Sequence, residues 1–426
     1  MIGVVADDTT GANDIGLMFA KNNYSVKIVT YSEHMVLSAD SDVLIVDTDS
    51  RLDSPEISYQ KVKKATKALQ QLGCSLYFKK TCSVFRGNIG SEFDAMLNAL
   101  GEEFAVITLA FPKNGRQTVH GIHTVYGKLL EHSNFRSDPV HPMRQSHLVS
   151  ILQEQTSRNV CHVDIEVVRQ GADVLKKEIE AKREIANYCI VDAETQEDLR
   201  IIAEAVHAFP VLGGSSSIAE ELPAFWGAKQ ADDILGRIAF TDENGVLVVS
   251  GSLTPQTREQ TAYLASMGVT TVILDSRRVF SSLEKESEIS RAVAFAAACL
   301  KEGKDVLVMA DNTEETVAQT KEIGRQQHVD SLAVSKLVSA ALAEVTRRTV
   351  GETGVKRLVV AGGDTSGTIC RALGIEGNYV LKEIETGLPS GLAIGREMLI
   401  GLKSGSFGKP DFLARAIEHL KEIAGS

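Results

Sequence analysis

A buried strand that runs directly into a glycine-rich turn most constrains how this chain can fold. Four apolar residues, 358–361, predict the strand. The sequence Gly-Gly-Asp-Thr-Ser-Gly follows at 362–367 and opens a helix through Ile369, Cys370 and Leu373. A helix N-terminus offers unpaired N–H groups and a partial positive charge, so this turn suits an anion such as phosphate. Capping of the helix by Asp or Ser explains the same turn without a ligand.

This turn differs from two familiar phosphate-binding patterns, because it has neither the Gly-Lys-Ser/Thr of a P-loop nor a full Gly-x-Gly-x-x-Gly. Gly362 and Gly363 let the backbone approach an anion closely, and Thr365 and Ser366 add hydroxyl donors. Asp364 adds a carboxylate that can accept a proton or help to hold a metal ion. The turn therefore predicts an anion site with a chemically active acid in it.

Strands and helices alternate along the chain, which indicates an α/β protein. The 426 residues are enough for two or more domains, each with its own core. Residues 222–245 have the composition of a boundary, so we predict domains at 1–230 and 240–426. Each domain is expected to be a largely parallel sheet flanked by helices. Strands are predicted at 2–6, 26–30, 43–46, 76–78, 104–109, 160–163, 188–191, 210–212, 246–249, 269–274, 305–310 and 358–361.

Polar segments follow several strands of the first half. Residues 7–14 contain three aspartates and two threonines, and residues 47–51 end in Arg51. Residues 79–88 place Lys79, Lys80 and Arg86 around small polar side chains. Open α/β sheets bind their ligands at the carboxyl ends of strands, so these segments predict a site for a small anionic substrate. The alternatives are helix capping for the aspartates and solvated turns for the basic residues.

Glycine-bearing loops recur in the second half at 250–255, 387–391 and 403–408, besides the turn at 362–367. Such loops at strand ends suit the phosphates of a nucleotide. In the first half, His120 and His123 lie three residues apart. Binding of a metal ion by this pair is one option, but the sequence offers no third ligand, so ordinary loop histidines are the preferred interpretation.

Charge and composition exclude several partners. The net charge of −11 argues against nucleic acid and anionic membranes as partners. Six scattered cysteines without a C-x-x-C pair indicate reduced thiols rather than a disulfide framework or a zinc site. The N-terminal segment meets Asp7 and Asp8 too early for a signal peptide, and no apolar run is long enough to span a bilayer. We therefore expect a cytoplasmic protein.

Taken together, these stretches resemble the four-carbon acid sugar kinase family over essentially the full chain. The matching segments are 6–14, 49–51, Lys80 with 86–88, 250–252, 361–367 and 403–405. The resemblance implies an N-terminal domain that binds a sugar acid, a C-terminal domain that binds ATP, and an active site in the cleft between them. Phosphate would pass to the terminal hydroxyl of threonate, erythronate, 3-oxo-tetronate or a close relative.

The resemblance also implies roles for particular residues. Substrate contacts are expected from Asp8, Arg51, Lys80, Thr81, Cys82, Ser83 and Arg86. ATP contacts are expected from Ser252, Gly362, Gly363, Asp364, Thr365, Ser366 and Gly405. Asp364 is the first choice for the catalytic base and Asp8 the second. Mg²⁺ is expected to bridge the phosphates, with ligands that the sequence does not identify. The oligomeric state stays open, a homodimer being one option.

One segment departs from the family pattern Lys-x-Asp-Ser-Thr-x-Arg-Gly, because this chain has Cys82 and Val84 in place of the acid and the threonine. A drier wall for a less hydroxylated substrate is the preferred interpretation. The alternative is a thiolate at Cys82, favoured by the neighbouring cations, that partly restores the negative charge. A non-catalytic sugar-acid and nucleotide sensor also stays open. A nucleotide-dependent oxidoreductase is less favoured, since the dinucleotide fingerprint is missing.

Overall fold

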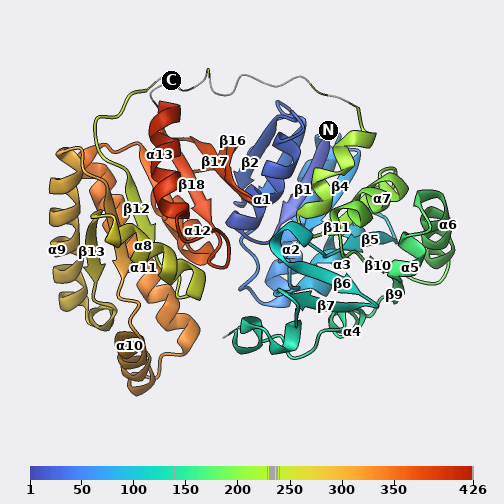
Figure 1. Cartoon of the computed structure of the whole chain (residues 1–426), viewed down its shortest axis with the longest axis horizontal. Helices are drawn as coiled ribbons and strands as arrows, with labels where there is room; N and C mark the ends of the chain where they lie inside the picture. The colour runs from blue at the N-terminus through green and yellow to red at the C-terminus, as the bar shows by residue number, and fades with distance from the viewer. Residues whose placement is uncertain (139, 228, 230–235, 237, 239, 425–426) are drawn as a thin grey trace. The chain divides into compact units, whose positions relative to one another are not determined.

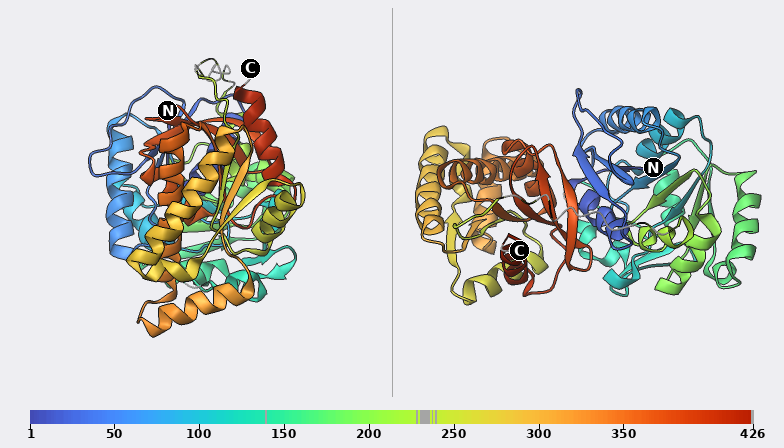
Figure 2. Two further views of the ribbon diagram at one scale, coloured as in Figure 1. Left: turned by 90° about the vertical axis from the view of Figure 1, so that its left-hand side faces the viewer. Right: turned by 90° about the horizontal axis from the view of Figure 1, so that it is seen from above.

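The chain divides into two units, Met1–Asp232 and Asp233–Ser426. The computed structural model describes residues 1–138, 140–227, 229, 236, 238 and 240–424 (Figure 1). The predicted domain limits at residues 230 and 240 lie on either side of this division, and residue 230 itself is outside the described residues. Helices flank the sheet of each unit, as two further views also show (Figure 2).

The first unit alternates strands and helices along most of its length. Its strands are β1 (Ile2–Ala6), β2 (Val26–Thr30), β3 (Val43–Asp47), β4 (Leu76–Lys80), β5 (Ala105–Thr108), β6 (Arg116–Val119), β7 (Ile122–Val125), β8 (Lys128–Leu129), β9 (Val160–Val163), β10 (Tyr188–Val191) and β11 (Val211–Gly214). Its α-helices are α1 (Thr9–Ala20), α2 (Pro55–Gln71), α3 (Ile89–Leu100), α4 (Leu148–Gln153), α5 (Ile165–Val168), α6 (Ala172–Arg183) and α7 (Gln196–Val206). Short 3₁₀ helices lie at η1 (Pro112–Asn114), η2 (Leu130–His132), η3 (Asn134–Ser137), η4 (Ser217–Glu220) and η5 (Leu222–Phe225).

The main sheet of the first unit is parallel throughout, in the order β2-β3-β1-β4-β11-β5-β10-β9. Its central strands are short apolar runs that are buried along their whole length, as strands covered on both faces require. Val5 and Leu44 on one face pack with Val62 of α2 and Phe93 of α3 in a single core. A small antiparallel sheet, β6-β7-β8, stands apart from the main one.

The second unit repeats the alternation and ends with an antiparallel part. Its strands are β12 (Leu247–Ser250), β13 (Thr270–Leu274), β14 (Val306–Ala310), β15 (Arg357–Ala361), β16 (Gly377–Glu385), β17 (Leu388–Ile394) and β18 (Leu399–Lys403). Its helices are α8 (Pro255–Ser266), η7 (Ser276–Phe280), α9 (Ser282–Lys301), α10 (Glu314–Gln326), α11 (Ser331–Thr353), α12 (Gly363–Ala372) and α13 (Phe412–Ala424). Strands β13-β14-β12-β15-β18 are parallel neighbours, and β17 and β16 continue the sheet antiparallel.

The structure confirms the predicted α/β class with two largely parallel sheets, and every predicted strand lies within two residues of an observed one. The prediction of a loop at 387–391 is wrong, because Leu388–Ile394 forms strand β17 and only a tight turn separates it from β16. The glycines there pass for loop residues in the sequence, yet Gly391 lies inside a paired strand. Within the described residues, no helix is both long and apolar enough to cross a membrane.

Candidate functional site

Four polar segments of the first unit begin at one edge of its sheet. Because β3, β1, β4 and β11 are parallel neighbours, Ala6 is level with Asp47 and Lys80, and Lys80 is level with Gly214. The segments that follow these residues therefore start side by side. They are 7–14, 48–51, 81–88 and 215–217, which include most of the substrate residues predicted from the sequence.

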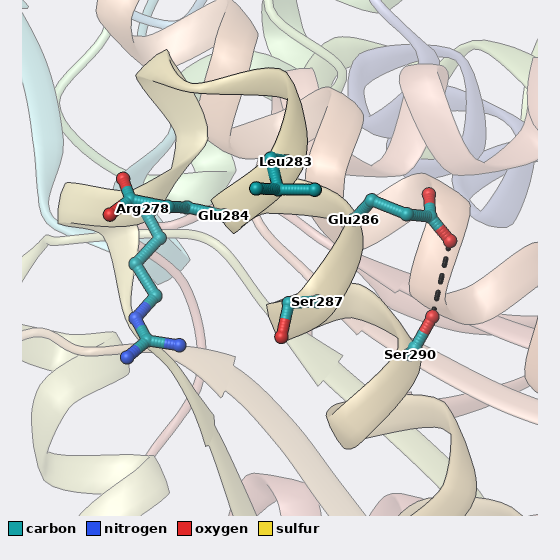
Figure 3. A pocket seen from close by; sticks show the side chains of 6 residues that line it. All are labelled: Arg278, Leu283, Glu284, Glu286, Ser287 and Ser290. Atoms are coloured by element: carbon teal, nitrogen blue, oxygen red, sulfur yellow. Dashed lines mark hydrogen bonds between the residues drawn. The ribbon is translucent and has the colours of Figure 1, made fainter.

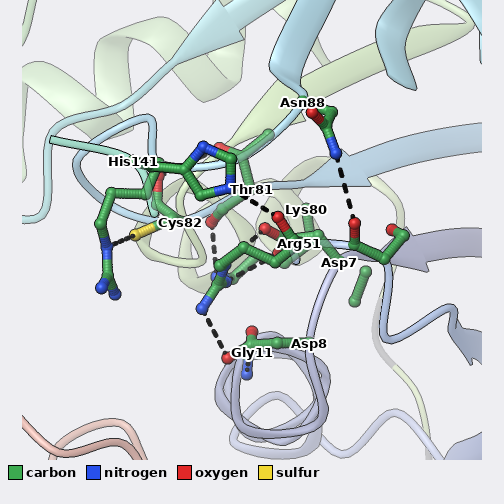
Figure 4. A network of polar contacts seen from close by, with 12 residues as sticks. Asp7, Asp8, Gly11, Arg51, Lys80, Thr81, Cys82, Asn88 and His141 are labelled. Carbon is green, nitrogen blue, oxygen red and sulfur yellow. Dashed lines mark hydrogen bonds and ion pairs between the residues drawn. The ribbon is translucent and has the colours of Figure 1, made fainter. Parts of the chain in front are cut away.

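Arg51 connects the two aspartates that follow β1 (Figure 4). Its Nε and Nη2 donate to the two carboxylate oxygens of Asp7, at 2.8 and 2.9 Å, and its Nη1 donates to Asp8 Oδ2 at 2.8 Å. Asp8 is also the N-cap of α1, since its Oδ1 accepts from Gly11 N at 2.9 Å. Burial alone would raise the pKa of Asp8, but Arg51 and Lys80 lower it to about 2. Asp8 is therefore a permanently ionised acceptor.

Lys80 and Asp14 are buried and lie close to each other beside Asp8. Lys80 Nζ donates to Thr81 O at 2.8 Å and lies 3.7 Å from Asp14 Oδ2, which also accepts from Ser216 Oγ at 2.6 Å. The other oxygen, Asp14 Oδ1, is buried without a hydrogen-bond partner among the described residues. Burial raises the pKa of Asp14 to about 6, although Lys80 acts in the opposite direction.

The segment after β4 positions Cys82 against Arg86. Arg86 Nε donates to Cys82 Sγ at 3.4 Å, and Arg86 Nη1 donates to Asp138 Oδ2 at 2.7 Å. Burial opposes ionisation of the Cys82 thiol, but Arg86 and Arg51 hold its pKa below the usual range. Val84 is completely buried, and both Cys82 and Val84 belong to the hydrophobic core of this unit.

Two other predicted substrate residues make backbone contacts within the first unit. The Thr81 side chain is completely buried, and Thr81 N donates to Gly214 O at 2.9 Å. Ser83 O lies 3.0 Å from Nε2 of His123. Burial lowers the pKa of His123 to about 3, so its ring is neutral when it contacts Ser83 O. His123 was expected to be an ordinary loop histidine, but it lies on strand β7 and is completely buried.

Three glycine-bearing segments of the second unit also begin at one edge of a sheet. Ser250, Ala361 and Lys403 are level with one another at the ends of β12, β15 and β18. The segments are so close that added side chains would collide. A Cβ on Gly251 would lie 2.2 Å from Thr365 Oγ1, and one on Gly405 would lie 2.5 Å from Ser252 Oγ.

The N-terminus of α12 is formed by the turn that the sequence singled out. Gly362 is its N-cap, with φ of +131° and without a capping side chain. Ser366 does not cap the helix either, because its Oγ donates to Gly362 O at 2.8 Å. The N-cap residue is thus a glycine without a side chain, and Ser366 does not cap the helix, so this N-terminus suits an anion. In the first turn of this helix, Asp364 is exposed, while the Thr365 side chain is buried.

The buried Lys403 forms hydrogen bonds with two of the neighbouring segments, at Thr257 and at Gly405. Lys403 Nζ donates to Thr257 Oγ1 at 2.8 Å and to Gly405 O at 3.1 Å, and burial lowers the pKa of this amine to about 7. Thr254 Oγ1 also donates to Gly405 O, at 2.6 Å. Thr254 and Thr257 were not among the predicted residues, although Thr254 is recognisable as the N-cap before Pro255.

The second unit also has a surface hollow of about 480 Å³, lined by Arg278, Leu283, Glu284, Glu286, Ser287 and Ser290 (Figure 3). Five of these residues lie on α9, and none belongs to a predicted site. Nothing in its chemistry points to phosphate or sugar, since Glu286 accepts from Ser290 Oγ and pairs with Arg348. The strand-end groups are therefore the candidate sites of their respective units.

Sequence reasoning missed several partners within the first unit's site. Asp138 pairs with Arg86, and His141 Nε2 lies 2.7 Å from Arg51 O. Lys79, expected to face an anion, instead forms a completely buried ion pair with Glu92 at 2.8 Å. These partners lie far from the strand ends in the sequence, and no local pattern marks them. Ser216, which contacts Asp14, is different, because it follows strand β11 and polar residues at a strand end indicate a site.

Comparison with known proteins assigns each unit a counterpart. Residues 2–222 match a family model described as a sugar-binding N-terminal domain, and residues 247–413 match one described as a nucleotide-binding C-terminal domain. The 3-oxo-tetronate kinase of Pseudomonas savastanoi is 31% identical over 436 residues, covering 100% of this chain and 98% of its own. That of Burkholderia multivorans is 32% identical over 438 residues, covering 100% and 98%.

Solved structures agree with these matches. A chain from Salmonella typhimurium superposes with a TM-score of 0.82 at 27% identity, covering 97% of this chain and 98% of that one. A Haemophilus influenzae protein superposes with a TM-score of 0.73 at 28% identity, covering 98% and 100%. The similarity in sequence and in structure thus extends over both units.

Proposed function

Because the chain belongs to the four-carbon acid sugar kinase family, we propose that it transfers phosphate from ATP to the terminal hydroxyl of a small sugar acid. One observation carries this proposal: a single chain matches both a sugar-binding and a nucleotide-binding domain, and its full-length relatives are 3-oxo-tetronate kinases. The four-carbon acid 3-oxo-tetronate is accordingly the first substrate to test, followed by threonate and erythronate.

In the proposed substrate site, ionised Asp8 accepts hydrogen bonds from substrate hydroxyls. Its pKa of about 2 keeps the carboxylate charged at any physiological pH. Arg86 and Lys80 supply positive charge for the substrate carboxylate, although Asp138 and Asp14 partly balance them. Arg51 already donates three hydrogen bonds to Asp7 and Asp8. We therefore propose that Arg51 orients Asp8 and is not the main residue that binds the substrate carboxylate.

In the proposed nucleotide site, the N-terminus of α12 holds the phosphates of ATP. Gly362 and Gly363 let the chain approach an anion closely at this helix N-terminus. Ser252 and Gly405 from the adjoining segments add contacts to the nucleotide. Phosphoryl transfer needs mainly in-line positioning and neutralisation of charge, which such a cradle supplies.

The residues at this end of α12 also fit Mg²⁺, which proteins usually hold through one or two carboxylates together with substrate phosphates. Asp364 is an exposed carboxylate in the first turn of α12, beside the buried Thr365 hydroxyl. When bound, Mg²⁺ neutralises charge on the phosphates. Asp364 is therefore proposed in one of two roles, as the base that takes the hydroxyl proton or as a neighbour of the metal. Asp8 is the weaker base, because its low pKa makes it a poor proton acceptor.

The proposal is tested by measuring ADP release with a panel of four- and five-carbon sugar acids. We expect turnover with at least one four-carbon acid, and product analysis should show phosphate on the terminal oxygen. An acid that binds without any ADP release, across the whole panel, would favour the non-catalytic sensor. Oxidation of a panel acid coupled to reduction of NAD or NADP would favour the oxidoreductase.

A further inference from the structure

A cluster of imidazoles and carboxylates lies in the first unit, away from the candidate substrate site. It forms where the tip of the β6–β7 hairpin meets the ends of β9 and β10 (Figure 1). His162 lies on β9, Asp164 follows that strand, and Asp192 follows β10. His120 comes from the turn of the hairpin. The sequence offered no third ligand for His120, because the others lie more than 40 residues downstream.

The donor atoms are already close enough to share one ion. The ligand atoms of His162, Asp164 and Asp192 all lie within 4.8 Å of one another. Donors about 2.0–2.1 Å from a tetrahedral Zn²⁺ lie roughly 3.3 Å apart, so only small shifts are needed. Asp192 is completely buried, while Asp164 is partly exposed and leaves a path from solvent.

One further observation points to a ligand between these groups. His162 Nε2 lies 2.9 Å from Asp192 Oδ1, yet this buried nitrogen makes no hydrogen bond within the described residues. Leaving a buried polar atom unsatisfied costs free energy, which a bound ion would recover. Gly121, with φ of +72°, lets the hairpin turn pack closely here, since an added Cβ would lie 3.0 Å from His147 Nε2 and 3.7 Å from His162 Nε2.

We propose that the first unit binds one divalent transition-metal ion, such as Zn²⁺, through His162 Nε2 and the carboxylates of Asp164 and Asp192. Imidazole in the ligand set favours Zn²⁺ and similar ions over Mg²⁺ and Ca²⁺, which prefer oxygen alone. His120 Nδ1, 2.7 Å from Asp164 Oδ2, orients that carboxylate from outside. Asp192 is held in turn by Gly121 N, at 3.1 Å.

The ion would join the ends of β9 and β10, and His120 would connect the hairpin to it through Asp164. The hairpin already forms a single bridge from Thr118 to Ala193. His123, on the same hairpin, contacts Ser83 O in the segment that carries Cys82 and Arg86. The site is thus structural, and its occupancy stabilises the support of the substrate segment. This inference does not depend on the proposed kinase activity.

The test uses the full chain, stripped of metal by a chelator and kept in excess Mg²⁺ without nucleotide. Titration calorimetry with Zn²⁺ should show one ion per chain, and thermal unfolding should occur at a higher temperature with Zn²⁺. His162→Ala and Asp192→Asn should lose this binding. His120→Ala should weaken it by about 10–100-fold, the usual effect of removing a residue that orients a ligand. His132→Ala, an exposed histidine outside the cluster, is the matched control.

The proposal is overturned if the parent does not bind Zn²⁺, or if His162→Ala and Asp192→Asn bind it as tightly as the parent. Circular dichroism checks that the variants are folded. A measurement on the parent alone avoids dependence on the variants: the anomalous signal of Zn²⁺ in crystals should peak about 2.0–2.2 Å from His162 Nε2. A peak at any other position would also overturn it.

Discussion

Arg51 and Asp7 form a two-point ion pair, in which Nε lies 2.8 Å from Oδ2 and Nη2 lies 2.9 Å from Oδ1. The Asp7 side chain is only 1% exposed, so the ion pair is buried on the side of the carboxylate. The third contact of the guanidinium goes to Asp8. Arg51 therefore holds Asp7 and Asp8 in place, although its position at a strand end predicted that it would bind the substrate carboxylate.

Replacing this arginine should destabilise the fold as well as reduce activity. Arg51→Met leaves Asp7 buried and unpaired, which should cost about 3–5 kcal/mol of unfolding free energy. Urea unfolding followed by circular dichroism measures the change. Arg325→Met removes an exposed arginine paired with Glu322 and should change stability little. Equal effects of the two substitutions would show that the Asp7 pair is not a structural brace.

The close approach of the second unit's segments gives a test of the nucleotide site. Gly405→Ala adds a methyl group 2.5 Å from Ser252 Oγ, whereas Gly351→Ala on α11 meets no atom within 4 Å. We expect Gly405→Ala to raise the Kd for ATP about tenfold, equivalent to about 1.4 kcal/mol, and Gly351→Ala to leave it unchanged. Titration of each variant with ATP, in the absence of acid substrate, measures this. An unchanged Kd for Gly405→Ala would place the nucleotide elsewhere.

Asp364→Asn separates the two proposed roles of this carboxylate. If Asp364 is the base, kcat should fall by ~10²–10⁴, while the affinity for ATP and Mg²⁺ stays nearly that of the parent. Single-turnover kinetics and equilibrium binding of ATP provide the two values. Loss of ATP or Mg²⁺ affinity, with turnover recovered at saturation, would instead make Asp364 a ligand of the metal or the nucleotide.

Asp14 should make stability depend on pH in an unusual direction. Burial raises its pKa from 3.8 to about 6, so between these values the folded protein holds a proton that the unfolded chain has lost. The stabilisation from this group is full below about pH 4 and is lost as the pH rises through about 6. Relative to Asp14→Asn, the parent's free energy of unfolding should fall by about 3 kcal/mol from pH 4 to 7. Denaturant unfolding of both proteins across this range measures it, and a constant difference contradicts the raised pKa.

The fold could be predicted from the sequence because buried parallel strands are short apolar runs followed by polar or glycine-bearing turns. Strand β15 and its turn are the clearest case. Strands β16 and β17 escaped prediction because they form an antiparallel pair whose residues partly alternate in burial and include glycines. Their pairing depends on contacts across the sheet, which local periodicity does not reveal.

The candidate site divides in the same way. Asp8, Arg51 and Lys80 stand out because each follows a predicted strand, and parallel strands bring those ends together. Asp138 was missed because it reaches the site only through the tertiary fold. Ser216 follows a predicted strand, but its contact with Asp14 also depends on the tertiary fold. The charge balance was missed for the same reason: sequence shows a run of cations, whereas the structure pairs each of them with a carboxylate.

Cys82 is where the structure most changes the interpretation of the sequence. The drier wall needs Cys82 and Val84 to face the ligand together, and in the structure both lie in the buried core, Val84 completely. Cys82 instead accepts a hydrogen bond from Arg86 Nε at 3.4 Å, and its thiol pKa is lowered by Arg86 and Arg51 against the effect of burial. We therefore propose the thiolate interpretation, in which Cys82 supplies the negative charge of the carboxylate that the family pattern has there.

This interpretation predicts that charge, rather than size, matters at position 82. Cys82→Asp should keep kcat/KM for hydroxylated four-carbon acids at or above the parent's value, whereas the neutral Cys82→Ser should lower it about tenfold. In the parent, kcat/KM should also decrease at low pH as the thiolate gains a proton, and this decrease should be absent in Cys82→Asp, whose carboxylate stays ionised to lower pH. Kinetics of the three proteins on one acid panel, each measured across pH, decide the matter. If Cys82→Ser matches the parent and Cys82→Asp is impaired, the site requires a neutral residue, and the thiolate interpretation fails.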